Sequence, residues 1–196
     1  MMFSLFTNKK QKELKSKRQQ LYRVAFSWCN DELLADDLVN ETLFKAMKKY
    51  NALRDKKNIN SWLFKILANC WYDHLRKIKP LVNIDDIVFV DHNTPEVLLQ
   101  QQEIIMQVRK VISSLPMGQR QVLTLVDLEG FSYDEVAQIL EIPIGTVMSR
   151  LNRSRLALKE KLIKKNTDNS QRDSVAEFAT QVTSFVADRP KLRSVQ

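Results

Sequence analysis

Glycine is scarce in this chain, with three residues among 196. Glycine-rich phosphate loops, Rossmann turns and turn-dense β-sandwiches need glycine for left-handed backbone or close approach, so these folds are hard to build from this sequence. Cysteine and histidine are also rare, with two of each, and neither Cys29 and Cys70 nor the two histidines show a metal-ligand spacing. We therefore expect no disulfide scaffold, no metal site and no cofactor.

Long apolar runs are missing as well. No stretch approaches the ~18 apolar residues that a membrane span requires, and the apolar start of the chain is too short for a signal-peptide core. Positive charge is abundant instead, because 31 Lys and Arg against 23 Asp and Glu give a formal net charge of +8. The sequence therefore predicts a cytoplasmic protein without direct membrane insertion, and a partner that is anionic.

The charge is unevenly distributed along the chain. Residues 1–80 carry 17 bases and 8 acids, yet within them residues 24–44 hold five acids and no base. Residues 146–165 hold seven bases and one acid. A charge run is most often a solvated helix face. The basic run is also typical of nucleic-acid binding, whereas DNA would repel the acidic run, which therefore requires a different partner.

Hydrophobic periodicity divides the chain into two modules. Apolar residues recur at helical spacing through the first domain, residues 1–80, which Pro80 ends. Residues 81–93 hold three acids and no base, lack this periodicity and are predicted to form a flexible acidic linker. The second domain covers residues 94–165, and a C-terminal tail covers residues 166–196. The predicted fold class is therefore all-α, with two small helical domains.

The end of the second domain has the pattern of a helix-turn-helix. Ser132 and Glu135 have the spacing of a capping box, which opens a short helix. Residues 141–145 make a turn, and a long cationic helix follows to about residue 165. Two helices joined by a short turn, the second of them basic, are typical of major-groove DNA binding.

Base-reading residues of the second helix are predicted from its inward face, which contains Val147 and Leu151. The residues directed outward are then Met148, Ser149, Asn152 and Arg153. Arginine pairs bidentately with guanine and asparagine with adenine. Arg150, Arg155 and Lys159 fit phosphate contacts, which set register without reading sequence. The alternative is a surface helix that its arginines merely keep soluble.

A further stretch, residues 60–77, interleaves aromatic and basic residues. It contains Trp62, Phe64, Trp71 and Tyr72 beside Lys65, Arg76 and Lys77. Aromatic faces with cationic neighbours suit the unstacked bases of single-stranded nucleic acid. Core packing explains the same aromatics, and spacing alone leaves both interpretations open.

Asp37 and Glu41 lie four residues apart, with Asn40 between them, and therefore share one face of a helix. A catalytic carboxylate pair is one interpretation, but no histidine, metal cluster or activated nucleophile accompanies them. An exposed acidic face that binds a basic protein surface is the better interpretation. We therefore expect a protein that is not an enzyme and has no small-molecule substrate.

Five segments occur together in the order and spacing of a known family: residues 36–44 (DDLVNETLF), 61–69 (SWLFKILAN), 115–116 (LP), 132–137 (SYDEVA) and 145–151 (GTVMSRL). They resemble the extracytoplasmic-function (ECF) sigma factors, two-domain bacterial RNA polymerase initiation subunits of the sigma-70 family. The resemblance covers roughly residues 14–165. It implies that the first domain docks on the β′ clamp helices of core RNA polymerase and melts the −10 element. It also implies that the second domain reads the −35 element of the promoter beside the β flap.

By position, the resemblance assigns roles to residues of three helices. The polymerase-binding helix would contribute Asp37, Asn40, Glu41 and Phe44. The −10 DNA would be bound by Trp62, Lys65, Asn69, Arg76 and Lys77. The −35 DNA would be bound by Thr146, Met148, Ser149, Arg150, Asn152, Arg153 and Arg155. An anti-sigma factor is implied as a regulatory partner.

Three residues depart from the family pattern. Asn40 stands where Gln is usual, and Met148 stands where a basic residue is common, so the −35 preference is expected to differ there. Glu141 replaces a Gly that is usual in the turn, which requires a strained backbone or a different turn geometry.

Two other classes of function fit parts of the sequence. A free-standing helix-turn-helix regulator would bind duplex DNA without polymerase, but it leaves the acidic run and the aromatic-basic stretch unexplained. A DNA recombinase with a helix-turn-helix tail would need a nucleophile within a convergent basic cluster, and no such set is visible. The carboxylate and aromatic-basic patterns therefore favour the polymerase subunit.

The tail over residues 166–196 lies outside the resemblance. Val175, Phe178 and Val182 fall on one helical face within it. The pattern fits a short amphipathic helix that packs on the protein itself or on a regulator, and it fits an inert terminus equally well.

Overall fold

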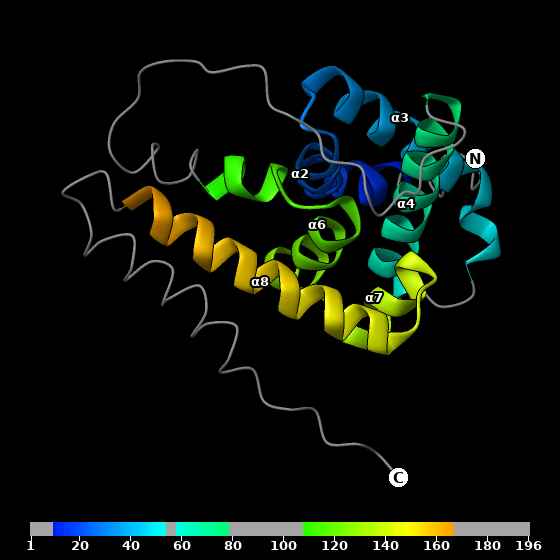
Figure 1. Cartoon of the computed structure of the whole chain (residues 1–196). Helices are drawn as coiled ribbons and strands as arrows, with labels where there is room; N and C mark the ends of the chain where they lie inside the picture. Colours follow the sequence, from blue (N-terminus) through cyan, green and yellow to red (C-terminus); the bar gives the residue numbers. More distant parts are fainter. Residues whose placement is uncertain (1–9, 54–57, 79–107, 167–196) are drawn as a thin grey trace, which may run out of the picture.

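The computed structural model describes residues 10–53, 58–78 and 108–166, and every regular element within these ranges is a helix (Figure 1). The predicted all-α fold class is confirmed. Within the same ranges, no helix combines the length and apolar character that crossing a bilayer requires. The linker predicted over residues 81–93 and the tail beyond residue 166 lie outside the described residues.

The first module contains three long helices. They are α2 (Arg18–Cys29), α3 (Glu32–Lys49) and α4 (Ile59–Ile78). A helical segment over residues 10–16 precedes α2, and a short 3-10 helix, η1 (Tyr50–Ala52), follows α3. These helices share one core, in which Trp28, Phe64 and Trp71 are among the largest fully buried side chains.

The turn between α2 and α3 fixes which face of α3 points outward. Asn30 takes a left-handed φ of 53°, a conformation that asparagine tolerates better than most residues. Asp31 then caps α3, because its Oδ1 accepts a hydrogen bond of 2.9 Å from the Leu34 N–H. Leu38 and Val39 of α3 are buried. The acidic residues on either side of them, Asp37 and Glu41, are consequently left on the surface.

The second module is a cluster of shorter helices that packs on one long helix. After a helical segment over residues 108–113 come α6 (Met117–Leu123), the π-helical continuation η4 (Thr124–Leu128), α7 (Tyr133–Leu140) and α8 (Ile144–Asn166). In Figure 1, α8 runs along one edge of the molecule, with α6 and α7 on its inner side. Val147 and Leu151 are buried, as the sequence predicts.

The predicted helix-turn-helix is present, but its turn is shorter than predicted, because α8 already begins at Ile144. Ser132 and Glu135 form the capping box, with each side chain bonded to the other residue's backbone N–H. Glu141 ends α7 with a left-handed φ of 55°. This conformation costs a non-glycine residue about 1–2 kcal/mol. The strained backbone expected at Glu141 is therefore present.

The two modules pack directly against each other. α4 lies on α7 and α2 lies on α6 (Figure 1). The Phe64 and Phe131 rings meet edge to face with centroids 5.1 Å apart, and the Trp71 Nε1–H donates to Met117 Sδ at 3.2 Å. The aromatic pair and the hydrogen bond both cross from one module to the other. The described helices therefore form a single body.

Arg120 of α6 is a fully buried charge at this junction. Its Nη1 donates to the Trp28 carbonyl in the last turn of α2 at 2.8 Å, and its Nη2 donates to the carbonyls of Leu115 (2.9 Å) and Ser113. Burial lowers the pKa of Arg120 to about 10. The carbonyl end of a helix is negative, which favours a cation at this place. Arg120 thus joins the end of α2 to the second module.

Candidate protein-binding and nucleic-acid-binding faces

The outer face of α3 gathers the residues predicted to bind polymerase. All four are exposed on this helix: Asp37, Asn40, Glu41 and Phe44. Large apolar side chains accompany them, because Leu33 is 81% exposed, Phe44 55% and Met47 48%. Exposed apolar residues among carboxylates are typical of a surface that binds another protein. We refer to these six residues together with Asp36, seven in all, as the α3 face.

Most polar groups of the α3 face are already paired with bases of the same chain. Arg18 of α2 donates through Nη2 to Asp36 Oδ1 at 2.8 Å and through Nη1 to Asn40 Oδ1 at 2.6 Å. Glu41 forms an ion pair of 2.8 Å with Lys45, one turn further along α3. Within the described ranges, Asp37 has no ion-pair or hydrogen-bond partner. Asp37 can therefore bind a partner without first breaking an intramolecular contact, unlike Asp36 and Glu41.

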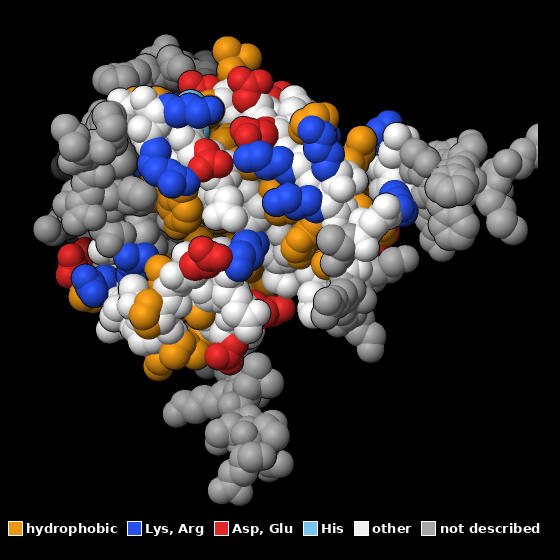
Figure 2. All heavy atoms as spheres, turned by 90° about the vertical axis from the view of Figure 1, so that its right-hand side faces the viewer, with side chains coloured by type: hydrophobic (Ala, Val, Ile, Leu, Met, Phe, Trp, Pro, Cys, Tyr) orange, Lys and Arg blue, Asp and Glu red, His pale blue; other side chains and the backbone are white. Residues whose placement is uncertain are grey.

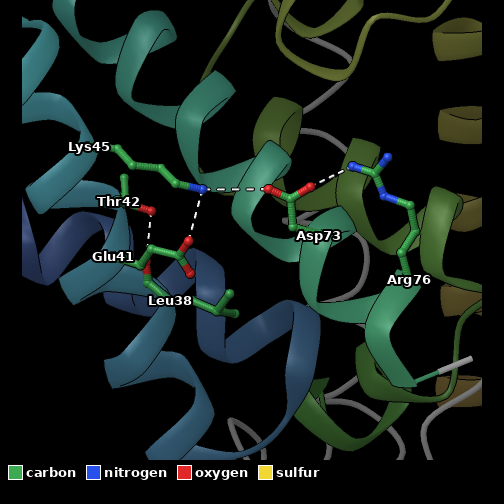
Figure 3. A network of polar contacts seen from close by, with 6 residues as sticks. All are labelled: Leu38, Glu41, Thr42, Lys45, Asp73 and Arg76. Atoms are coloured by element: carbon green, nitrogen blue, oxygen red, sulfur yellow. Dashed lines mark hydrogen bonds and ion pairs between the residues drawn. The ribbon is translucent and has the colours of Figure 1, made fainter.

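A chain of charges leads from the α3 face to α4 (Figure 3). Lys45 Nζ lies 2.8 Å from Glu41 Oε1 and 3.5 Å from Asp73 Oδ2, and the other oxygen of Asp73 accepts from Arg76. The hydrogen bond to Glu41 raises the pKa of Lys45. The network links a predicted polymerase-binding residue, Glu41, to a predicted DNA-binding residue, Arg76.

The aromatics of α4 divide into core residues and surface residues. Phe64 and Trp71 are fully buried, so core packing accounts for them. Trp62 and Tyr72 are half-buried, and the Tyr72 hydroxyl donates to Gln121 Oε1 at 3.1 Å. Of the four aromatics in the aromatic-basic stretch, Trp62 therefore retains the most freedom to meet a base.

The polar residues of α4 predicted to bind −10 DNA have different surroundings. Asn69, Arg76 and Lys77 are exposed. Lys65 is half-buried and its Nζ lies 2.8 Å from Glu141 Oε1, at the turn of the helix-turn-helix. Figure 2 looks onto the right-hand side of Figure 1, where basic and acidic side chains are interleaved over the surface. The positive charge of α4 is thus partly neutralised by the second module.

The outer face of α8 gathers the residues predicted to read −35 bases. Met148, Ser149, Asn152 and Arg153 are all exposed, as expected from the buried positions of Val147 and Leu151. Among the described residues, Arg153 is held within its own helix, through hydrogen bonds from Nε to the Ser149 carbonyl (3.3 Å) and from Nη2 to Ser149 Oγ (3.4 Å). Such long contacts are readily exchanged for a base edge. We refer to these residues, with Ile144, as the α8 face.

The other predicted −35 residues are less accessible. Thr146 and Arg150 are half-buried on the first turns of α8. Arg155 makes a bidentate pair with Asp127 of η4, with contacts of 2.8 and 3.2 Å. Its side chain is 27% exposed and that of Asp127 is 9% exposed. The structure thus gives Arg155 a role in fastening α8 to η4, and we omit it from the proposed DNA contacts.

The described residues offer little for catalysis. No group of three or more His, Cys, Asp or Glu side chains in these ranges is placed to hold a metal ion. Burial raises the pKa of the Cys29 thiol to about 11 and raises that of Cys70 as well. Both thiols therefore stay protonated at neutral pH, which makes them poor nucleophiles.

Comparisons with known proteins agree with this geometry. The family model "Sigma-70 region 2" matches residues 14–80, and the model "Sigma-70, region 4" matches residues 105–158. The chain is 34% identical over 124 residues to ECF RNA polymerase sigma factor EcfG of Rhodopseudomonas palustris, a match that covers 63% of this chain and 68% of that protein. This chain belongs to the ECF sigma factors of the sigma-70 family.

Two further relatives of this ECF sigma factor are informative. It is 31% identical over 138 residues to the ECF RNA polymerase sigma-E factor of Escherichia coli K12, a match that covers 64% of this chain and 72% of the relative. A solved structure of the sigma factor RpoE in complex with the anti-sigma factor NepR from Bartonella quintana is similar, with 32% identity and a TM-score of 0.60. That match covers 77% of this chain and 94% of the solved chain.

Proposed function

We propose that this sigma factor joins core RNA polymerase through the α3 face, binds the −10 element through α4 and reads the −35 element through the α8 face. The α3 face docks on the β′ clamp helices, and the second module lies beside the β flap. The protein acts where the polymerase is, in the cytoplasm. It stabilises an opened promoter and breaks no bond itself.

One observation carries this proposal: two chemically opposite faces lie on one body. The α3 face presents carboxylates and large apolar side chains, whereas α8 presents arginine, asparagine and serine. DNA repels the first surface and attracts the second. A protein that binds only DNA has no use for the α3 face, and a protein that binds only polymerase has no use for the α8 face.

The contacts between the modules require a movement during this function. By their nominal positions, the −10 and −35 elements lie about 25 base pairs apart, which is about 85 Å of duplex DNA at the 3.4 Å rise per base pair. In this structure Lys65 Nζ of α4 lies 2.8 Å from Glu141 Oε1. Glu141 begins the turn between α7 and α8. The two modules must therefore separate when both elements are bound.

An anti-sigma factor is the regulatory partner that we propose. The similar sigma factor from Bartonella quintana was solved in complex with such a protein. A surface that binds polymerase through apolar residues, as the α3 face does with Leu33, Phe44 and Met47, also offers an inhibitor a place to compete.

Transcription in vitro tests the proposed function. The full chain is mixed with purified bacterial core polymerase on a library of promoter fragments, and run-off transcripts are sequenced. We expect transcripts that start downstream of a shared pair of elements, and none from core polymerase alone. Asp37→Lys/Glu41→Lys should abolish these transcripts, whereas Asp134→Lys, an exposed acid on α7, should retain them.

Two outcomes would contradict the proposal. The absence of promoter-specific transcripts at low salt, with core polymerase active on a control promoter, would overturn it. Sequence-specific duplex binding that proceeds equally well without polymerase, together with no transcripts, would instead favour a free-standing helix-turn-helix regulator.

A further inference from the structure

The first two turns of α8 expose two large apolar side chains where a DNA-reading helix would otherwise be polar. Ile144 is 44% exposed and Met148 is 54% exposed. They are four residues apart and therefore lie on the same side of the helix. Both flank the polar residues of the α8 face. Binding buries this apolar pair favourably only if the partner presents an apolar group to it.

The described part of the chain leaves the space beside this pair open. A Cβ added at Gly145, between the two residues, would meet no atom within 4 Å apart from its two chain neighbours and the backbone of its own helix. Pro143 and Gly145 are exposed along with Ile144 and Met148. The start of α8 is thus exposed on the side that carries the apolar pair, which leaves the pair accessible to a partner.

The charge of α8 indicates which kind of partner groove this helix can enter. From residue 146 to residue 165 the helix carries seven bases and one acid. Ser149, Asn152 and Arg153 next to the apolar pair are hydrogen-bonding residues of the kind that read base edges. An acidic protein would satisfy the bases but not this mixture of polar and apolar groups. The major groove of duplex DNA satisfies both, because it is anionic and admits one α-helix.

The major groove displays one apolar group on its base edges, the C5-methyl group of thymine. Guanine, adenine and cytosine present only hydrogen-bond donors and acceptors there. A thioether and a branched alkyl group gain nothing from those edges, whereas they remove a methyl group from water when they contact it. The apolar pair therefore favours thymine over every other base at the positions that it faces.

We propose that Ile144 and Met148 select thymine in the −35 element by contact with its C5-methyl group. The proposal rests on the proposed function, since it specifies what the α8 face reads. Arg153 and Asn152 read neighbouring bases by hydrogen bonds, whereas Ile144 and Met148 read one or two thymines by a methyl contact. The −35 preference thus combines two kinds of recognition on one helix face.

Replacing thymine by deoxyuridine tests this contact, because the substitution removes the methyl group and leaves the base pair intact. Holoenzyme binding is measured on the promoter found by transcription, with each −35 thymine replaced in turn. For the wild type we expect binding to weaken about three- to fivefold at one or two positions, the value of one buried methyl group. Met148→Ala and Ile144→Ala should bind thymine and deoxyuridine equally at the positions that they face.

Two controls sharpen the experiment. Cytosine and 5-methylcytosine, placed at the sensitive position, should differ by a similar factor for the wild type, because the methyl group returns without the thymine hydrogen bonds. Leu156→Ala removes a side chain that is also exposed on α8, at 57%, but about two turns beyond Met148. This variant should retain the preference for thymine over deoxyuridine.

The results separate this inference from the proposed function. Promoter binding by the wild type that is insensitive to deoxyuridine at every −35 position overturns the methyl contact and leaves the proposed function intact. The same holds if Met148→Ala and Ile144→Ala both keep the full preference, or if the selected −35 elements contain no thymine on either strand. Loss of promoter binding by the wild-type holoenzyme overturns both.

Discussion

The α3 face and the α8 face differ in how their polar groups are held before any partner arrives. On α3, Arg18 binds Asp36 and Asn40, and Lys45 binds Glu41, so most acidic groups begin paired. On α8, the Arg153 guanidinium is held by two long bonds to Ser149 of its own helix. The α3 face, which we propose binds polymerase, is thus largely neutralised in advance, and the α8 face, which we propose reads DNA, is not.

This difference indicates where each face obtains its affinity. A partner of the α3 face must exchange existing ion pairs, so its net electrostatic gain is small and exposed Leu33 and Phe44 supply much of the binding energy. A partner of the α8 face gains charge contacts at little cost, so its binding is strongly salt-dependent. Both faces belong to one body, because Arg120, the Phe64–Phe131 ring pair and the Trp71–Met117 hydrogen bond join the modules.

The largest expected effect concerns this junction. Arg120→Met should lower the free energy of unfolding by about 3–5 kcal/mol, because three carbonyls lose a charged donor in a buried place. Urea denaturation followed by circular dichroism measures it. Arg153→Met on the α8 face is the matched control and should stay within about 0.5 kcal/mol of the wild type. Equal effects of the two variants would show that the junction does not stabilise the body.

The second prediction concerns the pH dependence of stability that the buried thiol of Cys29 produces in the core of the first module. Burial raises the pKa of Cys29 from 9.0 to about 11, so the unfolded thiol ionises first as pH rises. The stabilising contribution is therefore complete below pH 9 and is lost as pH rises through 11. It amounts to about 2–3 kcal/mol. Cys29→Ala should unfold with a correspondingly flatter pH dependence between pH 9 and 11, and an unchanged slope would contradict the assignment.

A third pair of variants divides the α8 face into base-reading and phosphate-binding residues. Arg153→Ala should lose about 1–3 kcal/mol of discrimination at one −35 position, whereas Arg150→Ala should weaken binding to all sequences and reduce the salt slope by about one. Binding of both variants to single-position −35 substitutions at several salt concentrations measures this. Uniform losses for Arg153→Ala would count against its role as a base reader.

The smallest expected effect is on polymerase binding, and it tests whether the pairing of Arg18 with Asp36 and Asn40 competes with polymerase for the α3 face. Arg18→Ala releases Asp36 and Asn40, so core polymerase should bind about two- to fivefold more tightly. Arg23→Ala is the control, because Arg23 is also exposed but pairs with Glu129 in the second module. Weaker binding by Arg18→Ala would show that Arg18 positions these groups for polymerase instead of competing with it.

Local patterns in the sequence predicted much of the fold and both faces. The helical spacing of Val147 and Leu151 determined which residues of α8 are exposed. The capping box at Ser132 and the unusual backbone at Glu141 also depend on residues close together in the chain. Hydrophobic periodicity, helix caps and turns depend on residues close together in the chain, so they can be predicted from one sequence.

Contacts between distant residues could not be predicted in the same way. Arg120 looks like any surface arginine of a helix, yet it is buried against the Trp28 carbonyl, 92 residues away. Arg155 looks like a phosphate-binding residue until Asp127 is found beside it. The ion pair of Lys65 with Glu141 likewise depends on how the modules pack. Such pairs depend on tertiary structure, which residue spacing does not specify.

The central claim is that the two faces serve two different partners, and one crossed measurement tests it. Core polymerase binding and −35 duplex binding are measured at equilibrium for the wild type, for Asp37→Lys/Glu41→Lys and for Arg150→Ala/Arg153→Ala. The account predicts that the first variant loses at least tenfold for polymerase and stays within about twofold for duplex DNA, and that the second shows the reverse. Polymerase binding that survives the carboxylate reversal, or equal losses in both assays for either variant, would contradict it.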